Sequence, residues 1–249
     1  MMKKTTKINE PSLPELIPTL RLSNNTQYFY ELQTHVYMFF LDKNFDIRTA
    51  MAFLSSEERD RATAMKDERA RRHFTAARSA LRLILADLYA VPVSAIEFDY
   101  SPNGKPFVKN PVAQARWGFS ISHAGDKILI GVSRNREIGV DIEVVAQRQN
   151  IDHVLQSLFS PLDYEWVDSG DESKRLERFY KIWCRREATL KAYGKGARYP
   201  TRNIDWHLVP MSPASLPDDP LSLGIRGRVY MMDLDVFPRC VASLAIIAQ

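Results

Sequence analysis

The sequence predicts an α+β protein in which short strands and long helices alternate along the chain. Short β-branched stretches alternate apolar and polar residues, which is typical of half-buried strands. Two longer stretches repeat apolar residues every three or four positions, which is typical of amphipathic helices. The predicted order strand–helix–strand–strand occurs on both sides of about residue 138. A chain of 249 residues can bury one large core or two smaller ones.

The chain before residue 138 is expected to supply strands, two helices and a hairpin. Strands are expected at 36–41, 96–100, 119–122 and 128–133, the last two as the hairpin. Residues 55–58, Ser-Ser-Glu-Glu, have the acidic first turn of a helix start, and apolar spacing predicts a long helix over 69–89. Residues 101–104 form a turn that presents Lys105.

The later part of the chain is expected to begin with a strand around Asp141. Helices are expected over 151–158, from 160 onward and around Phe179, and strands near 204–208, 227–234 and 240–247. The predicted domains are an N-terminal extension of residues 1–35, an N-terminal half of residues 36–138, and a C-terminal half of residues 139–249 that carries the candidate metal-binding acids.

Two carboxylates lie two positions apart in the apolar run Ile138-Gly139-Val140-Asp141-Ile142-Glu143. Side chains alternate faces along a strand, so Asp141 and Glu143 point the same way, roughly 6.6 Å apart, while Val140 and Ile142 point into a core. Like charges on a half-buried surface repel, and a hard divalent cation such as Mg²⁺ offsets that repulsion through oxygen ligands. An edge strand with a solvated polar face is the alternative.

A predicted helix from Phe179 to Gly196 carries Glu187 and Lys191 one turn apart, on the same face as Trp183. An ordinary surface ion pair, worth about 0.2–0.5 kcal/mol, would explain the two charges. They can equally supply a third metal ligand and a phosphate contact.

Ser122 and His123 end an alternating stretch that leads into a turn. A lone histidine is more often structural than catalytic. The position of His123 on the hairpin that precedes Asp141 favours a functional role.

Four motifs follow one another in a fixed order. They are Gly104-Lys105-Pro106, Ser122-His123, Gly139-Val140-Asp141-Ile142-Glu143 and Trp183-Cys184-Arg185-Arg186-Glu187-Ala188-Thr189-Leu190-Lys191. In this order and spacing, from about residue 36 onward, the chain resembles the 4′-phosphopantetheinyl transferases, specifically the larger surfactin-type (Sfp-like) class. Two positions depart from the family pattern. Arg186 stands where Lys is usual, which keeps the charge but changes the donor geometry, and Ser120 stands where Asn is common.

The resemblance implies a fold and a reaction. The fold has two similar α/β halves related by a pseudo-twofold axis, with the active site between them. The reaction transfers the 4′-phosphopantetheine arm from coenzyme A to a serine of an apo carrier protein of acyl, peptidyl or polyketide type, and releases 3′,5′-ADP. It depends on Mg²⁺, for which Mn²⁺ can substitute.

The resemblance also implies roles for individual residues. Asp141, Glu143 and Glu187 are the expected metal ligands, and Glu187 is the expected base for the serine proton, directly or through a bound water. Lys191 and His123 are expected to hold phosphate oxygens during catalysis. Residues expected to contact coenzyme A are Lys105, Ser122, His123, Lys191, Arg59, Arg61, Arg72 and His73.

Composition agrees with a cytoplasmic enzyme. The formal net charge is +4, and basic residues gather between 59 and 82, where a solvated helix face is the simplest explanation. The resemblance adds coenzyme A phosphates and an acidic carrier as partners for these charges. Interleaved aromatic residues are missing there, so no nucleic-acid partner is expected. No apolar run suits a membrane span or a signal peptide, and the two cysteines fit no disulfide framework, so we expect a cytoplasmic location. A monomer is also expected.

Two other functions stay open on the residues alone. A metal-dependent phosphohydrolase acting on a nucleotide-type pyrophosphate, or a nuclease, also uses three carboxylates, but it activates water and needs no acceptor serine. A non-catalytic carrier-binding module would bind its partner without metal, yet it has no physical reason to keep three mutually repelling acids.

Overall fold

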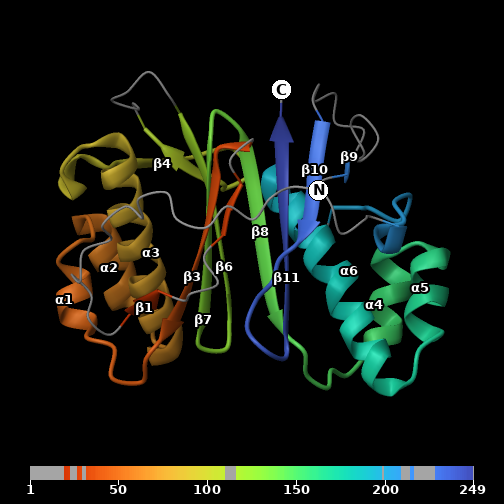
Figure 1. Ribbon diagram of the computed structural model, residues 1–249. Helices are drawn as coiled ribbons and strands as arrows, with labels where there is room; N and C mark the ends of the chain where they lie inside the picture. Colours follow the sequence, from red (N-terminus) through yellow and green to blue (C-terminus); the bar gives the residue numbers. More distant parts are fainter. Residues whose placement is uncertain are drawn as a thin grey trace.

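The computed structural model describes residues 20–22, 27–29, 32–109, 116–197, 199–208, 214–215 and 228–248. These residues form four layers in Figure 1, with helices on the two outer sides and two antiparallel sheets between them. Two of the candidate acids, Asp141 and Glu143, lie on a strand where the two sheets meet, and the third, Glu187, lies on a helix.

The N-terminal half contains three α-helices and one of the two sheets. Its helices are α1 (Ile47–Met51), α2 (Ser56–Ala64) and α3 (Glu68–Tyr89). Its sheet has the order β1 (Leu20–Leu22), β3 (Thr34–Leu41), β7 (Lys127–Arg134), β6 (Trp117–Ala124), and β2 (Gln27–Phe29) also pairs with β3. The 3₁₀ helix η2 (Val93–Ala95) leads into a separate hairpin of β4 (Phe98–Tyr100) and β5 (Pro106–Val108).

The C-terminal half contains the other sheet and three more α-helices. Its sheet has the order β8 (Glu137–Val144), β11 (Cys240–Ala248), β10 (Arg228–Asp233), β9 (Ala214–Ser215). Its helices are α4 (Ile151–Leu158), α5 (Pro161–Asp168) and α6 (Glu172–Ala192), followed by the 3₁₀ helix η3 (Trp206–Leu208). The predicted division between residues 138 and 139 falls within β8.

The two halves repeat one arrangement. In each half one strand, β3 or β8, is followed by helices, the last of which is long, and later by a pair of strands, β6 and β7 or β10 and β11. In the N-terminal half β3 pairs with β7, and β7 pairs with β6. In the same way, β8 pairs with β11 and β11 with β10 in the C-terminal half. The long helices α3 and α6 have 22 and 21 residues. The predicted α+β fold of two similar halves is therefore confirmed.

Local signals in the sequence explain where the helices begin. Ser55 and Glu58 form a capping box, in which the Ser55 hydroxyl accepts from the Glu58 amide at 3.2 Å and the Glu58 carboxylate accepts from the Ser55 amide at 3.0 Å. The Ser160 hydroxyl caps α5 in a similar way, with Pro161 at the first helical position. Both helix starts were predicted from these residues.

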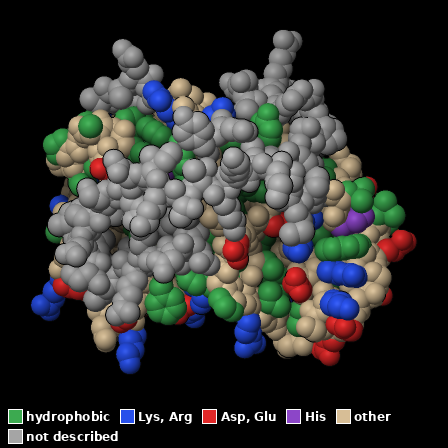
Figure 2. Space-filling model, in the orientation of Figure 1, with side chains coloured by type: hydrophobic (Ala, Val, Ile, Leu, Met, Phe, Trp, Pro, Cys, Tyr) green, Lys and Arg blue, Asp and Glu red, His purple; other side chains and the backbone are tan. Residues whose placement is uncertain are grey.

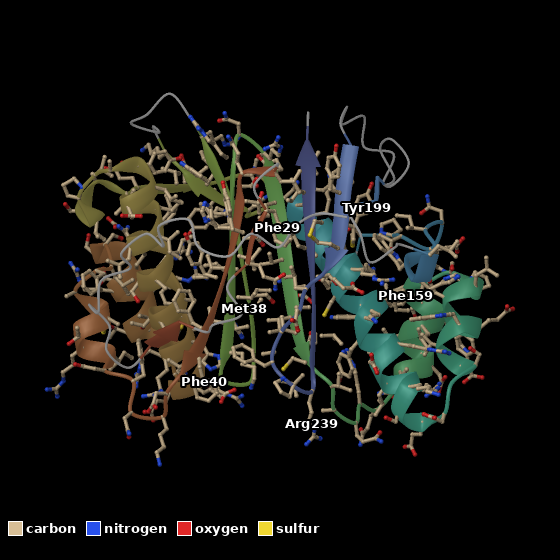
Figure 3. All side chains as sticks on the ribbon, viewed as in Figure 1. Phe29, Met38, Phe40, Phe159, Tyr199 and Arg239 are labelled. Atoms are coloured by element: carbon tan, nitrogen blue, oxygen red, sulfur yellow. The ribbon has the colours of Figure 1, made fainter. Side chains whose placement is uncertain are left out.

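Three apolar clusters hold the four layers together. One lies between α3 and the first sheet, and another lies between α6 and the second sheet. The third lies between the two sheets and includes Met38 of β3, labelled in Figure 3, together with Val140 and Ile142 of β8. Val140 and Ile142 therefore point into a core, as the strand alternation predicted.

Side-chain hydroxyls join the two sheets at the seam between β6 and β8. Among the described residues, no backbone ladder connects these two strands. Instead, the Ser120 hydroxyl accepts a hydrogen bond from the Val140 amide at 3.1 Å, and the Ser122 hydroxyl accepts one from the Ile142 amide at 3.4 Å. Both serines are buried. The seam thus brings β6 against the strand that carries Asp141.

Gly139 lets α6 approach β8 closely. A Cβ at this position would lie 1.9 Å from the Ala188 carbonyl oxygen and 2.5 Å from the Ala192 amide nitrogen. These are backbone atoms of a packed helix, so they cannot give way as a flexible side chain would. The motif glycine two residues before Asp141 therefore has a packing role.

We expect Gly139→Ala to lower the free energy of unfolding by about 3 kcal/mol or more, because overpacking at a tight contact costs roughly 1–3 kcal/mol even where neighbours can shift. Thermal unfolding measures this effect. Gly196→Ala is the matched control, since a Cβ there meets nothing within 4 Å. Equal losses of melting temperature in the two variants would contradict the prediction.

The structure differs from the sequence predictions in a few places. The strand predicted at 204–208 is wrong: the Asp163 carboxylate accepts from the amides of Trp206 and His207 and holds them in η3. The basic stretch is not one solvated face, because Arg78 and Arg82 are buried and pair with Glu58. Strands β1 and β2 lie in the predicted N-terminal extension, and β5 was not predicted. No helix in the described part of the chain has the length and apolar character to cross a membrane.

Candidate active site

Asp141 is buried at the seam, on the opposite face of β8 from Val140 and Ile142. It is 5% exposed, and its Oδ1 accepts hydrogen bonds from Ser122 Oγ and from Lys191 Nζ, each at 2.8 Å. Its Oδ2 is also buried, and it has no hydrogen-bond partner among the described residues. A buried carboxylate oxygen without a partner is energetically costly, which points to a missing ligand.

Glu143 and Glu187 complete a group of three carboxylates with Asp141. Glu143 accepts a hydrogen bond from the Trp183 side chain, and Glu187 Oε1 pairs with Arg186 Nη1 at 2.5 Å. Burial raises the pKa of Glu143, and the charge of Asp141 raises it further. Burial also raises the pKa of Glu187, an effect that Arg186 opposes and Asp141 reinforces. The acids therefore disfavour one another's charge, as the strand spacing predicted.

The chemistry of these acids suits a hard divalent cation. Carboxylate oxygens are the donors that Mg²⁺ and Mn²⁺ prefer, and the unpartnered Asp141 Oδ2 supplies a free one. In the arrangement that the described residues adopt, no three His, Cys, Asp or Glu side chains are grouped so that they could hold an ion. Lys191 and Arg186 pair with Asp141 and Glu187 instead. A bound cation would therefore require the acids to move closer together, while Arg186 can keep its pair with Glu187 Oε1 and leave Oε2 for the ion.

Lys191 bridges the two halves at the acids. Besides Asp141, its Nζ donates to the backbone carbonyls of Val140 on β8 at 3.1 Å and Ile121 on β6 at 3.5 Å. Its ion pair is thus made with Asp141 on β8, and not with Glu187 one turn away on the same helix, while the Ile121 carbonyl is its contact with the other half.

His123 lies near Asp141, and a second histidine, His73, lies beside His123. His123 is exposed, and its ring centroid is 5.0 Å from that of the buried His73 on α3. Burial lowers the pKa of both rings. The charge of Lys191 lowers the pKa of His123 further, and the charge of His123 lowers the pKa of His73 further. The lowered pKa favours the neutral form of both imidazoles, and a neutral imidazole can donate an N–H to an anion.

An open cavity of about 460 Å³ lies beside His73. It is bounded by the end of β3, the start of α3 and the turn between β6 and β7, and Lys43, Arg69 and Arg72 line it together with His73. Phe40, labelled in Figure 3 near the end of β3, forms part of its wall. Asp42 and Asp126 also line it, but Lys43, Arg69 and Arg72 outnumber them, so the cavity suits a negatively charged ligand.

Lys105 lies away from the acids. The predicted turn does present it, but its Nζ donates to Glu137 Oε2 at 2.7 Å and to the Ala192 carbonyl at 2.8 Å. Burial lowers its pKa, while Glu137 opposes this effect. Glu137 precedes Asp141 by four strand residues, or about 13 Å. In this structure Lys105 therefore links the β4–β5 hairpin to β8 and to the end of α6.

The structure brings most of the predicted site residues together. Those beside one another at the seam or the adjoining cavity are Asp141, Glu143, Glu187, Lys191, Ser122, His123, His73 and Arg72. The Ser122 hydroxyl bonds Asp141, so it orients an acid. The Arg72 guanidinium donates to backbone carbonyls of Asp42 and Lys43.

The two arginines predicted on α2 differ in their positions. The Arg59 guanidinium donates to the Leu54 carbonyl at 2.6 Å, which holds it at the start of its own helix. The Arg61 guanidinium lies 5.0 Å from the ring centroid of Phe74, the residue after His73. Of the two, only Arg61 therefore contacts a residue next to the histidine pair.

Two residues at the site were not assigned individual roles in the sequence interpretation. The exposed Arg148 lies with its guanidinium 4.8 Å from the centroid of the Trp183 ring, and its charge acts on Glu143. Arg69 lines the cavity. Arg69 could have been found because it precedes His73 by one helical turn, whereas the sequence holds no signal for the stacking of Arg148.

Family models match both halves of the chain. Residues 137–228 match the model described as 4′-phosphopantetheinyl transferase superfamily. Residues 42–134 match the model described as 4′-phosphopantetheinyl transferase, N-terminal. The two matched segments meet at the seam.

Curated relatives carry related names. The chain is 30% identical over 215 residues, 86% of its own length and 87% of the other, to the 4′-phosphopantetheinyl transferase HetI of Nostoc sp.. It is 31% identical to a phosphopantetheinyl transferase of Thraustochytrium sp., over 58% of this chain and 54% of that one. It is also 31% identical to the 4′-phosphopantetheinyl transferase psf-1 of Bacillus pumilus, over 48% of each chain. The last two matches span about half of each relative.

Proposed function

The chain belongs to the 4′-phosphopantetheinyl transferase superfamily and is an enzyme that transfers the 4′-phosphopantetheine arm of coenzyme A to a carrier protein, and we propose that the acids around Asp141 carry out this reaction. The observation that supports these residues most is the buried, unpartnered Asp141 Oδ2 at a seam to which both halves contribute. Since one chain contains both halves, we also propose the larger surfactin-type class and a monomer.

We propose that Asp141, Glu143 and Glu187 hold Mg²⁺ or Mn²⁺. A cation held there would neutralise charge on the pyrophosphate of coenzyme A, so that 3′,5′-ADP would be a better leaving group. Three carboxylates that disfavour one another's charge support this assignment.

The remaining residues act on the phosphates and on a proton. Lys191 and His123 donate hydrogen bonds to pyrophosphate oxygens, and the exposure of His123 leaves its ring accessible. The carrier serine oxygen bonds to the β-phosphorus while the bond from that phosphorus to the oxygen of 3′,5′-ADP breaks. Glu187 takes the serine proton, since an ionised carboxylate close to the reacting oxygen can serve as the base.

We propose that the nucleotide end of coenzyme A lies in the cavity beside His73. A ring-to-ring contact of 5.0 Å between His73 and His123 connects this cavity to the acids. One molecule can therefore reach from Arg69 and Lys43 to Lys191, with its pyrophosphate between the two positions.

Arg69→Gln tests the nucleotide site. We expect the dissociation constant of coenzyme A to rise about tenfold, because a charge-assisted hydrogen bond contributes roughly 1.5–3 kcal/mol and Arg69 is partly solvated. Calorimetry measures this dissociation constant. Arg71→Gln is the matched control, because Arg71 lies on the same helix but does not line the cavity. A smaller loss with dephospho-coenzyme A assigns Arg69 to the 3′-phosphate. Unchanged affinity in Arg69→Gln would remove the nucleotide from this cavity.

Carrier proteins of acyl, peptidyl or polyketide type are the proposed acceptors. Figure 2 shows Lys and Arg side chains interspersed with Asp and Glu over the helices of the C-terminal half, so this part of the visible face carries mixed charge. We propose that the net charge of +4 attracts an acidic carrier, and that the enzyme is cytoplasmic, because both cysteines are free.

Mass spectrometry of apo carrier proteins incubated with coenzyme A, Mg²⁺ and the enzyme tests the whole proposal. A carrier that gains the mass of the phosphopantetheine arm supports it, and the panel of carriers defines which types are accepted. Coenzyme A that is split in the absence of any carrier, with no mass gain when carriers are added, would instead show a phosphohydrolase.

A further inference from the structure

The Arg186 side chain is completely buried beside Glu187. Its guanidinium uses all three nitrogens: Nε donates to Thr201 Oγ1 at 2.8 Å, Nη1 to Glu187 Oε1 at 2.5 Å, and Nη2 to two backbone carbonyls. The carbonyls are those of Ala197 at 2.7 Å and Tyr199 at 2.8 Å. A single side chain thus connects the catalytic helix to the segment that follows it.

The same network continues to α4. Thr201 is fully buried, and its hydroxyl donates to the carbonyl of Leu158, the last residue of α4. The Arg186 guanidinium also lies 6.0 Å from the ring centroid of Phe159. Figure 3 labels Phe159 and Tyr199, both on the side of the C-terminal half. Arg186 is therefore the centre of a buried contact among α4, α6 and the residues Ala197, Tyr199 and Thr201.

A lysine could not make this contact. Its ammonium places all three donors on one nitrogen, whereas the acceptors here surround a planar fork from separate directions. Glu187 would then lose a directional partner, because one point charge cannot face the carboxylate, the threonine hydroxyl and two carbonyls at once. The arginine thus fixes the rotamer of Glu187 in a way that charge alone does not.

We propose that Arg186 is a positioning residue, which holds the Glu187 carboxylate in its reactive orientation and fastens Ala197, Tyr199 and Thr201 beside it. This inference rests on the proposed role of Glu187. Arg186 contacts neither substrate nor reacting atoms in this scheme. Its effect on the reaction passes through Glu187 alone.

Arg185 provides a matched control on the same helix. It is 4% exposed, and its guanidinium donates to both carboxylate oxygens of Asp233 and to the Trp206 carbonyl. It is therefore as buried and as fully bonded as Arg186, but its ion pair is with Asp233 and not with the three acids. We expect R185K to damage the packing without changing any contact of Glu187.

The test compares R186K with R185K in steady-state transfer, thermal unfolding and Mn²⁺ binding followed by electron paramagnetic resonance. For R186K we expect kcat to fall about tenfold, the KM for coenzyme A to stay within about twofold, and Mn²⁺ to bind several-fold more weakly. For R185K we expect a similar loss of melting temperature with unchanged kcat and Mn²⁺ affinity. Wild-type kcat and Mn²⁺ affinity in R186K, or equal losses in R185K, would overturn the proposal.

A second pair of variants applies if R186K does not fold. Thr201→Val removes the Nε acceptor and nothing else from the Arg186 fork, and we expect it to lower kcat about threefold. Thr189→Val is its control, because that buried hydroxyl donates only to the Arg185 carbonyl. Equal kcat in both would overturn the inference. Glu187→Gln with full activity would instead show that the proposed function of Glu187 is wrong.

Discussion

Asp141→Asn is expected to lower the rate of phosphopantetheine transfer by about 10³-fold or more. The amide keeps an acceptor oxygen for Ser122 and Lys191 but loses the charge that a cation needs. Lewis-acid stabilisation of a phosphoryl group is worth several kcal/mol, and about 4 kcal/mol corresponds to that factor. Transfer to one carrier protein, followed by mass spectrometry at saturating coenzyme A, measures the loss.

The variant should still fold and bind coenzyme A, because its shape and hydrogen bonds at Oδ1 persist. Asp163→Asn is the control: this carboxylate is fully buried in the same half and accepts from the amides of Trp206 and His207, away from the acids. It should lose stability and keep its rate per folded molecule. More than one tenth of the wild-type rate in Asp141→Asn would remove Asp141 from the ligand set.

Lys191→Met is expected to reduce both transfer and stability. It removes a phosphate donor, and it leaves the 5%-exposed Asp141 without its cation. Breaking a fully buried ion pair lowers the free energy of unfolding by about 3–5 kcal/mol. Because Lys191 is partly exposed, we expect a loss of about 2 kcal/mol, which corresponds to a melting temperature lower by roughly 4–8 °C. Transfer should fall about 10²-fold or more, because a charge-assisted contact to the reacting phosphate is lost.

A double variant separates the two effects. Asp141→Asn combined with Lys191→Met removes both charges, so the melting temperature should recover most of the loss seen in Lys191→Met. The transfer activity should not recover. A double variant that is as unstable as Lys191→Met would show that the lysine stabilises the seam through the Val140 and Ile121 carbonyls instead.

Much of the fold could be predicted because its signals are local. The two-residue period placed Asp141 and Glu143 on one face of β8, and the helical period located α3 and α6. The same period could not show what each side chain meets. The partner of Lys105 on α6 is 87 positions away, and that of Lys191 on β8 is 50 positions away.

The remaining errors have the same physical origin. Residues 204–208 are apolar enough to be taken for a strand, but the Asp163 carboxylate, more than 40 positions earlier, caps them as a 3₁₀ helix. Arg78 and Arg82 belong to a basic stretch in sequence, yet Glu58 neutralises them inside the fold. In each case a distant carboxylate decides the outcome, and no window of neighbouring residues contains it.

The seam also bears on solubility. Strands β6 and β8 are each the last strand of their sheet, and each covers the open edge of the other through Ser120 and Ser122. An uncovered edge with β-branched apolar residues is a template for pairing with other chains. Either half produced alone would present such an edge, so joining the two halves in one chain protects the protein from aggregation in the same place where it builds the active site.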